Sequence, residues 1–249
     1  MPQIKDSLYE QLNPLTTVAG QHFVDDFSGD TPDVMRWGFG YQNSTTGNVA
    51  SMADEIDGGI LLTTGSDDND QALYMSFMAG TDLDGTGNAT LTTIPIRPFE
   101  SGLANMICTV RNNTPILTMG NFFAGFSESG RGDAAGDNMA GVSAHKSYFA
   151  GYFTFLTSNS GGGQGTTNSD LTRDTAWHTY NFSSNVTADP TPAGAASKMS
   201  IDGVLKATRT GAIGYFNENV APIFATQRTS TTSGGASMNI RYCEAWNEV

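Results

Sequence analysis

One segment in the second half of the chain constrains the fold more than any other feature. Residues 174–182 read Asp-Thr-Ala-Trp-His-Thr-Tyr-Asn-Phe. In an extended strand, successive side chains point to opposite faces, so Trp177 and Thr179 face one way while His178 and Tyr180 face the other. The alternation of large apolar and polar side chains predicts a strand with one face in a core.

A second segment about twenty residues later predicts a hairpin beside that strand. Residues 198–208 contain the pair Asp202-Gly203 between two short alternating runs. Asp-Gly is a favoured two-residue turn in β-hairpins because both positions tolerate positive φ. We therefore expect neighbouring strands of an antiparallel sandwich.

The rest of the chain follows the same pattern. Twenty-nine glycines and nine prolines punctuate about a dozen short apolar runs in a chain of 249 residues. Such spacing predicts an all-β fold, a two-sheet antiparallel β-sandwich of jelly-roll type, formed by one domain over residues 21–249. In the last run, Met238, Ile240, Tyr242, Glu244 and Trp246 alternate with other residues, which predicts that they share one face.

The order of these pieces resembles the concanavalin A-like lectin/glucanase (laminin G-like) superfamily. The resemblance is carried by Asp-Asp-Phe at 25–27, the following Trp37, Gly-Gly-Ile-Leu-Leu at 58–62, the Trp177-His178 strand and Ile-Asp-Gly-Val at 201–204. It implies a jelly-roll fold. Jelly rolls of this kind are found in lectins, in glucanases, and in capsid decoration and fibre proteins of tailed phages.

Residues 1–20 differ from everything after them and predict a short helical or extended arm. Ile4, Leu8 and Leu12 recur at four-residue spacing, and Asn13-Pro14 would stop a helix there. A three-turn helix is too short to be stable alone, so its apolar stripe needs another surface. That surface is either the same domain or a neighbouring subunit, and we expect these three residues to contact a partner.

Charge and hydropathy limit the partners. Twelve basic and twenty-five acidic residues give a net charge of −13 without a basic cluster, which argues against direct nucleic-acid binding. The sequence has no apolar run of about 18 residues and no apolar signal segment, so we expect no membrane span and synthesis in the cytoplasm without a signal peptide. Cys108 and Cys243 lie in apolar runs and are expected to be buried free thiols, with a disulfide between the strands as the alternative.

Catalytic patterns are weak. Retaining glucanases of the superfamily carry a Glu-x-Asp-x-Glu strand, but Glu55 and Asp57 are followed by Gly59 in place of the second glutamate. No histidine is paired by sequence with a nucleophile, so we expect structural or surface roles for His22, His145 and His178. We therefore expect no enzymatic activity.

Two sets of residues remain as candidate ligand sites. Asp82, Asp84 and Asn88 place oxygen donors in one loop, as a calcium site would, although Thr93 stands where an EF-hand has glutamate. A solvated hairpin turn is the alternative. Trp37, Tyr41 and Tyr215 lie near predicted turns, where an exposed ring stacks against a sugar in sandwich lectins; burial in the core is the alternative for these rings.

These features together resemble tailed-phage decoration proteins. We expect a structural virion protein, namely a capsid decoration (cement) protein that bridges subunits of the major capsid protein or another virion protein. We expect it to act as a homo-oligomer, with a trimer favoured, and to require no cofactor. The first alternative is a carbohydrate-binding module, alone or mounted on a virion as an adhesin, and the second is a glycan hydrolase.

Overall fold

A computed structural model of the chain describes residues 22–28, 37–42, 49–52, 59–64, 72–76, 102–113, 120–127, 139–144, 149, 151–159, 163–186, 196–210, 215–216, 220–228 and 236–248. Within this part of the chain, every regular element is a β-strand. The arm predicted over residues 1–20 lies outside the described residues. No helix among the described residues is long and apolar enough to cross a membrane.

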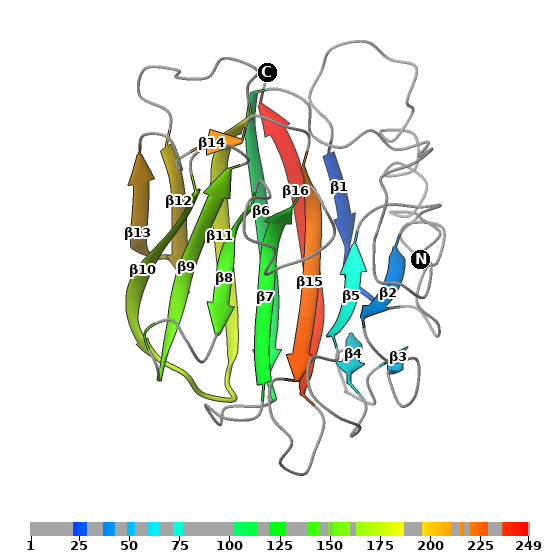
Figure 1. The fold of residues 1–249 in the computed structure, drawn as a ribbon. Helices are drawn as coiled ribbons and strands as arrows, with labels where there is room; N and C mark the ends of the chain where they lie inside the picture. The colour runs from blue at the N-terminus through cyan, green and yellow to red at the C-terminus, as the bar shows by residue number, and fades with distance from the viewer. Residues whose placement is uncertain are drawn as a thin grey trace.

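The strands form two sheets that stack face to face (Figure 1). Sheet A follows the order β13 (Val204–Thr210), β12 (Ala196–Ile201), β11 (Trp177–Val186), β6 (Gly102–Asn112), β16 (Ser237–Glu248), β4 (Ile60–Thr63), β3 (Val49–Met52). Off this path, β1 (His22–Asp25) pairs with β16 and β14 (Tyr215–Phe216) pairs with β11. Sheet B follows the order β10 (Gly163–Thr172), β9 (Tyr152–Asn159), β8 (Met139–Ala144), β7 (Gly120–Ser127), β15 (Ala221–Arg228), β5 (Ala72–Ser76), β2 (Gly38–Gln42).

All strand pairs are antiparallel except β14 with β11, which is parallel. The predicted fold class is therefore confirmed: the chain is an all-β, two-sheet antiparallel sandwich of jelly-roll type. Most neighbours in the sheets are distant in sequence, as when β6 pairs with both β11 and β16. These long-range pairings place strands from both halves of the chain on one continuous surface.

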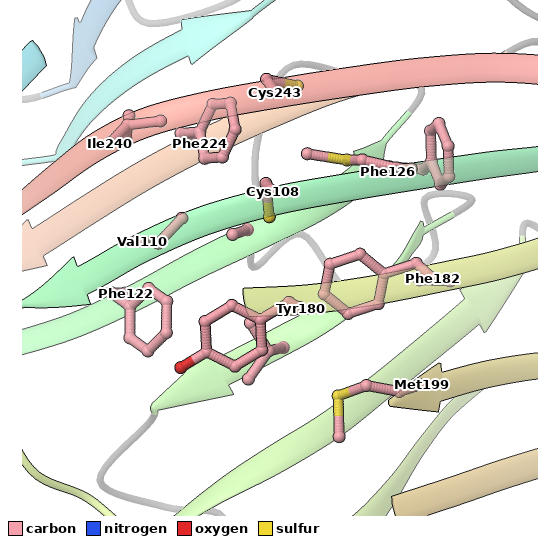
Figure 2. Packing of buried hydrophobic residues seen from close by; sticks show 14 of the residues in the cluster. Cys108, Val110, Phe122, Phe126, Tyr180, Phe182, Met199, Phe224, Ile240 and Cys243 are labelled. Atoms are coloured by element: carbon pink, nitrogen blue, oxygen red, sulfur yellow. The ribbon is translucent and has the colours of Figure 1, made fainter. Parts of the chain in front are cut away.

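The core lies between the sheets. Phe122 and Phe126 on β7 point toward Tyr180 and Phe182 on β11 (Figure 2), and all four side chains are buried. The ring of Tyr180 stacks on that of Phe182 with 6.2 Å between centroids, and it meets the Phe122 ring at 6.3 Å. The predicted alternation of β11 is confirmed, and the structure adds which side faces the core: every second residue from His178 onward is buried.

The predicted hairpin is also present. β12 and β13 are joined at Asp202 and Gly203, which have φ values of 51° and 79°. Two consecutive positive φ values match the twist of a tight β-hairpin, and a glycine at the second position adopts one without steric cost. The backbone N–H of Asp202 donates to the carbonyl of Thr179, which ties the turn to β11.

The prediction for the last strand is wrong at one point. Met238 and Ile240 face the core as expected, but the pairing of β16 with β6 shifts register between Ile240 and Tyr242. This β-bulge makes Arg241 the extra residue. Beyond a bulge the alternation changes phase, so Tyr242, Glu244 and Trp246 lie on the outer face instead of beside Met238.

The two cysteines are free and buried, as predicted, and they are register partners on β6 and β16. Both lie within the apolar core (Figure 2). Burial raises the pKa of the Cys108 thiol and of the Cys243 thiol well above the usual value. The thiols therefore stay protonated and behave as small apolar side chains.

Candidate functional site

His178 joins three segments at the end of the sandwich where β11 begins. Its Nδ1 lies 2.7 Å from Asp202 Oδ2 in the β12–β13 turn, and its Nε2 lies 3.0 Å from Asp174 Oδ1. The other oxygen of Asp202 accepts the backbone N–H of Thr179 at 2.9 Å. Behind the imidazole, the ring of Phe153 lies 5.6 Å away, edge to face. We call His178, Asp174 and Asp202 the His178 clamp.

The surroundings of the clamp favour the charged forms of His178 and Asp202. Burial disfavours the imidazolium, but the hydrogen bonds and negative charges of Asp202 and Asp174 outweigh it and raise the pKa of His178 above 6.5. For Asp202, burial is outweighed by the hydrogen bonds from His178 and Thr179, so its pKa is lowered from 3.8. Both ring nitrogens are occupied by carboxylates, which fits the predicted structural role and leaves neither nitrogen placed to act as a general base.

The outer face of sheet A carries a second cluster beside the clamp. The guanidinium carbon of Arg111 on β6 lies 4.9 Å from the centroid of the Trp177 ring, and that of Arg241 on β16 lies 4.8 Å from it. Arg111 also donates from Nε to Asn113 Oδ1 at 2.9 Å and from Nη2 to Asn239 Oδ1 at 3.3 Å. Two cations therefore share one half-buried indole. We call Arg111, Trp177 and Arg241 the Arg-Trp-Arg cluster.

Further along β16, the same face carries a group that contains carboxylates and aromatic rings. Glu244 accepts a hydrogen bond from the Tyr242 hydroxyl at 2.7 Å and lies 2.8 Å from His22 Nε2. The Trp246 ring meets the His22 ring edge to face, with 6.4 Å between centroids, and its N–H donates to Glu248 at 3.4 Å. These side chains are ordered by one another and remain partly exposed, with 40% of His22 and 27% of Glu244 accessible.

The outer face of sheet A is thus an ordered surface rich in Trp, Tyr and Arg. Such residues dominate the binding energy of protein interfaces because they offer large contact areas and directional polar groups at a modest entropy cost. Hydrogen bonds and ring contacts among side chains of neighbouring strands hold these groups in place. The geometry suits a broad partner surface.

The outer face of sheet B has a different character. Its central strands carry a second buried apolar cluster, separate from the core between the sheets, consisting of Phe123, Met139, Leu156, Ile223 and Ala225. Because Phe122 and Ala124 on the same strand belong to the main core, Phe123 lies on the opposite face of the sheet. These five side chains are at most 5% exposed, so this apolar cluster is already enclosed within the chain.

The predicted sugar-stacking role of Trp37 is contradicted. Its side chain is only 1% exposed, its ring packs 5.5 Å from Phe27 and 5.8 Å from Phe224, and its N–H donates to Asp25 Oδ2 at 2.8 Å. A ring enclosed in the core has no face for a sugar. For Tyr41 and Tyr215, only the backbone positions in β2 and β14 are described.

Other predicted sites lie outside the described residues. These are the arm residues Ile4, Leu8 and Leu12, the calcium candidates Asp82, Asp84 and Asn88, and the carboxylates Glu55 and Asp57. Among the residues that the structure describes, no group of three or more His, Cys, Asp or Glu side chains is arranged to hold a metal. Sequence reasoning put Trp177 on the face opposite His178 without deciding which face lies outside. It missed both arginines, which reach the Trp177 ring from strands remote in sequence.

Comparison with known proteins identifies the fold. No protein-family model matches the sequence, and no curated protein is significantly similar to it. Among solved structures, a protein of unknown function from Shewanella oneidensis MR-1 aligns over 100% of this chain and 96% of its own, at 14% identity and a TM-score of 0.58. The Emp47p carbohydrate recognition domain aligns over 92% and 95%, at 11% identity and a TM-score of 0.57.

A β-1,3-glucanase from Mycobacterium marinum aligns over 90% of this chain and 97% of its own, at 14% identity and a TM-score of 0.57. Identities this low establish shared architecture only. The lectin-type and glucanase structures share the two-sheet jelly roll described above. The chain therefore has the fold of the concanavalin A-like lectin/glucanase superfamily.

Proposed function

We propose that this chain is a non-catalytic structural protein of a tailed-phage virion, a capsid decoration protein that binds other protein subunits through the outer face of sheet A. Its partner would be the major capsid protein or another virion protein, and it would act as a homo-oligomer, with a trimer favoured. The observation that carries the proposal is the ordered row of tryptophan, tyrosine and arginine side chains on that face.

The mechanism is burial of surface. A stable protein interface removes roughly 800 Å² per partner from water. A rigid sheet that presents half-buried aromatic rings loses little side-chain entropy when it is covered, so most of the contact energy remains available for binding. When a shell binds many copies, each weak contact adds to its resistance to internal pressure.

Binding to particles tests the proposal. Virions assembled without the protein would be mixed with the purified chain and sedimented, and we expect the chain to pellet with them and to raise their disruption temperature. The double variant Trp246→Ala/Tyr242→Ala should pellet less, while Val204→Ser, an exposed apolar site outside this row, serves as the matched control. A chain that stays in the supernatant with intact virions would contradict the proposal.

The sequence adds a second point of attachment. Deleting residues 1–15, which removes Ile4, Leu8 and Leu12, should leave the sandwich folded and abolish attachment to the particle or to other copies. Sedimentation with virions and light scattering measure these effects, and circular dichroism checks the fold. A truncated chain that assembles like the wild type would refute the role of the arm.

A second candidate function is glycan binding, which is favoured by the similarity of the fold to the Emp47p carbohydrate recognition domain. Titration calorimetry with laminarin, lichenan and mannose oligosaccharides, with calcium and with EDTA, separates the two functions. Saturable binding to one of these sugars, without sedimentation on virions, would favour the glycan-binding function. Calcium-dependent binding would direct attention to Asp82, Asp84 and Asn88.

A further inference from the structure

We propose that Trp246 and Glu248, on the outer face of sheet A, form a binding site for an arginine side chain of a protein partner. This inference rests on the proposed function, because it names the chemistry of the partner at the same face. It is carried by the contrast between two tryptophans of this face. Trp177 has arginines of its own chain over its ring, whereas Trp246 lies among carboxylates.

The Trp246 ring is held in place by its neighbours. Its Nε1 donates to Glu248 Oε1 at 3.4 Å, and the same oxygen accepts from Asn105 Nδ2 at 3.2 Å. The His22 ring meets the indole at 88°, so the two rings do not stack flat on each other. The indole is partly exposed, and no arginine or lysine among the described residues lies over it. An ordered indole of this kind can take a cation from outside the chain.

Glu248 supplies the charge at the edge of this ring. The residue is exposed, and its Oε1 receives both hydrogen bonds just described. Its Oε2 accepts no hydrogen bond from the part of the chain that the structure describes. A carboxylate has acceptor positions on both oxygens. A planar guanidinium group can therefore lie over the indole and donate to Oε2 in one arrangement.

A second carboxylate lies two residues earlier on the same face. Glu244 accepts from the Tyr242 hydroxyl at 2.7 Å and lies 2.8 Å from His22 Nε2, yet 27% of its side chain is accessible. Burial raises the pKa of Tyr242, and so do the hydrogen bond to Glu244 and the negative charge around it. Alternate residues of a strand are roughly 7 Å apart, so two arginines separated by one residue match the spacing of Trp246 and Glu244.

The charge around the site favours a basic partner. The chain carries a net charge of −13. Arg241 is five residues before Trp246, or roughly 17 Å along the strand, and Lys198 is three strands away, or roughly 14 Å across the sheet. Arg241 is also held over Trp177, which lies in the opposite direction along the sheet. At about 0.1 M salt the Debye length is about 10 Å, so these cations oppose an incoming arginine only weakly.

The arrangement favours arginine over a quaternary ammonium group such as choline. A quaternary ammonium group cannot donate a hydrogen bond, and proteins recognise it with a cage of several aromatic rings. Here a single indole stands beside a carboxylate oxygen that can accept one. The guanidinium group of arginine combines a flat surface for the ring with donors for the carboxylate.

NMR titration of the ¹⁵N-labelled chain with the peptide acetyl-Gly-Arg-Gly-Arg-Gly-amide, in about 0.1 M salt, tests the inference. The chain has three tryptophans, so the indole N–H signals of Trp37, in the core, and of Trp177 are internal controls. We expect the Trp246 signal, assigned with Trp246→Phe, to shift until it saturates while the other two stay in place.

Two matched variants test the role of the carboxylate. Glu248→Gln keeps an oxygen for the indole N–H but removes the charge, so it should bind the peptide about tenfold more weakly. Asp170→Asn removes the same charge from an exposed site on β10 in sheet B, and it should bind like the wild type. Equal weakening by the two variants would show attraction by net charge alone and would overturn the inference.

Other outcomes also decide against the site. An unmoved Trp246 signal, or equal binding of a peptide with uncharged citrulline in place of arginine, would overturn it. Choline chloride that shifts the Trp246 signal at a lower concentration than the peptide would overturn it in favour of a quaternary ammonium ligand. In the virion experiment, Glu248→Gln that pellets as well as the wild type would refute this inference and leave the proposed function intact. A chain that binds the peptide but stays in the supernatant would contradict the proposed function alone.

Discussion

Replacing the histidine of the His178 clamp should destabilise the protein in a manner that depends on pH. The substitution His178→Gln keeps a polar side chain of similar length but removes the charge and the paired hydrogen bonds to Asp174 and Asp202. The substituted residue lies against the Phe153 ring in both proteins, so packing changes little. The difference in unfolding free energy between the two proteins then reports mainly on the clamp.

The magnitude follows from burial. Hydrogen bonds involving a charged group contribute about 1.5–3 kcal/mol each when they are well shielded. The His178 side chain is 9% exposed, but Asp174 and Asp202 are 47% and 52% exposed, so solvent screens the pair. Exposed ion pairs contribute about 0.2–1 kcal/mol each to stability. Each interaction of the clamp should contribute an amount between the values for exposed and shielded pairs. We expect a total of about 2 kcal/mol, or a fall in Tm of about 4–8 °C for a chain of this size.

The pH dependence follows from the direction of each pKa shift. The pKa of His178 is raised by its two carboxylates, so its contribution is fully present below about 6.5 and is lost as pH rises through the raised value. The pKa of Asp202 is lowered, so its contribution is present above about 3.9 and is lost as pH falls through the lowered value. The destabilisation by His178→Gln should therefore be greatest between about pH 4 and 6.5.

Urea unfolding followed by tryptophan fluorescence at pH 5.5 and pH 9 measures this effect. Asp174→Asn serves as the companion variant, because it keeps an oxygen for the Ala176 N–H and removes one of the two charges. It should lose part of the stability at pH 5.5 and little at pH 9. A His178→Gln difference that is equal at the two pH values, or larger at pH 9, would refute the reasoning.

Three further predictions concern the stability of the fold. Gly141→Ala should lower the free energy of unfolding, measured by chemical denaturation, by about 3 kcal/mol or more, because its Cβ would lie 2.3 Å from a backbone carbonyl oxygen. Gly203→Ala, at a position with open space and a positive φ, should lower it by about 1 kcal/mol, and equal losses for the two variants would contradict the steric argument. A thiol reagent at pH 8 should modify neither Cys108 nor Cys243 until the protein is unfolded, and rapid labelling of the native chain would disprove their burial. Trp37→Phe should lower the free energy of unfolding by about 2 kcal/mol, because Asp25 loses a hydrogen bond. The same substitution should leave any glycan binding measured by calorimetry unchanged, and a loss of binding without a loss of stability would restore the predicted sugar-stacking role of Trp37.

Much of the candidate surface was beyond sequence reasoning. The alternation around Trp177 correctly put that ring on the face opposite His178 and Tyr180, because the two-residue period of a strand is a local property. Which of the two faces lies outside follows from the sheet that packs against β11. The arginines over it come from β6 and β16, and their positions follow from strand pairing between segments far apart in the chain. Likewise, His178 gains Asp202 only because the turn folds back onto β11.

The amino-acid sequence by itself determined the all-β class, the strand at Trp177, the Asp202-Gly203 turn and the opposite faces of Trp177 and Tyr180. Each depends on neighbouring residues, through the period of the strand and the backbone freedom of the turn. Only the tertiary structure decided the bulge at Arg241, which arises where β16 must stay in register with β6. Whether a side chain is buried also depends on elements that pack on it from elsewhere in the chain. For that reason only the structure shows that Trp37 is a core residue and that the outer face of sheet A is the candidate surface.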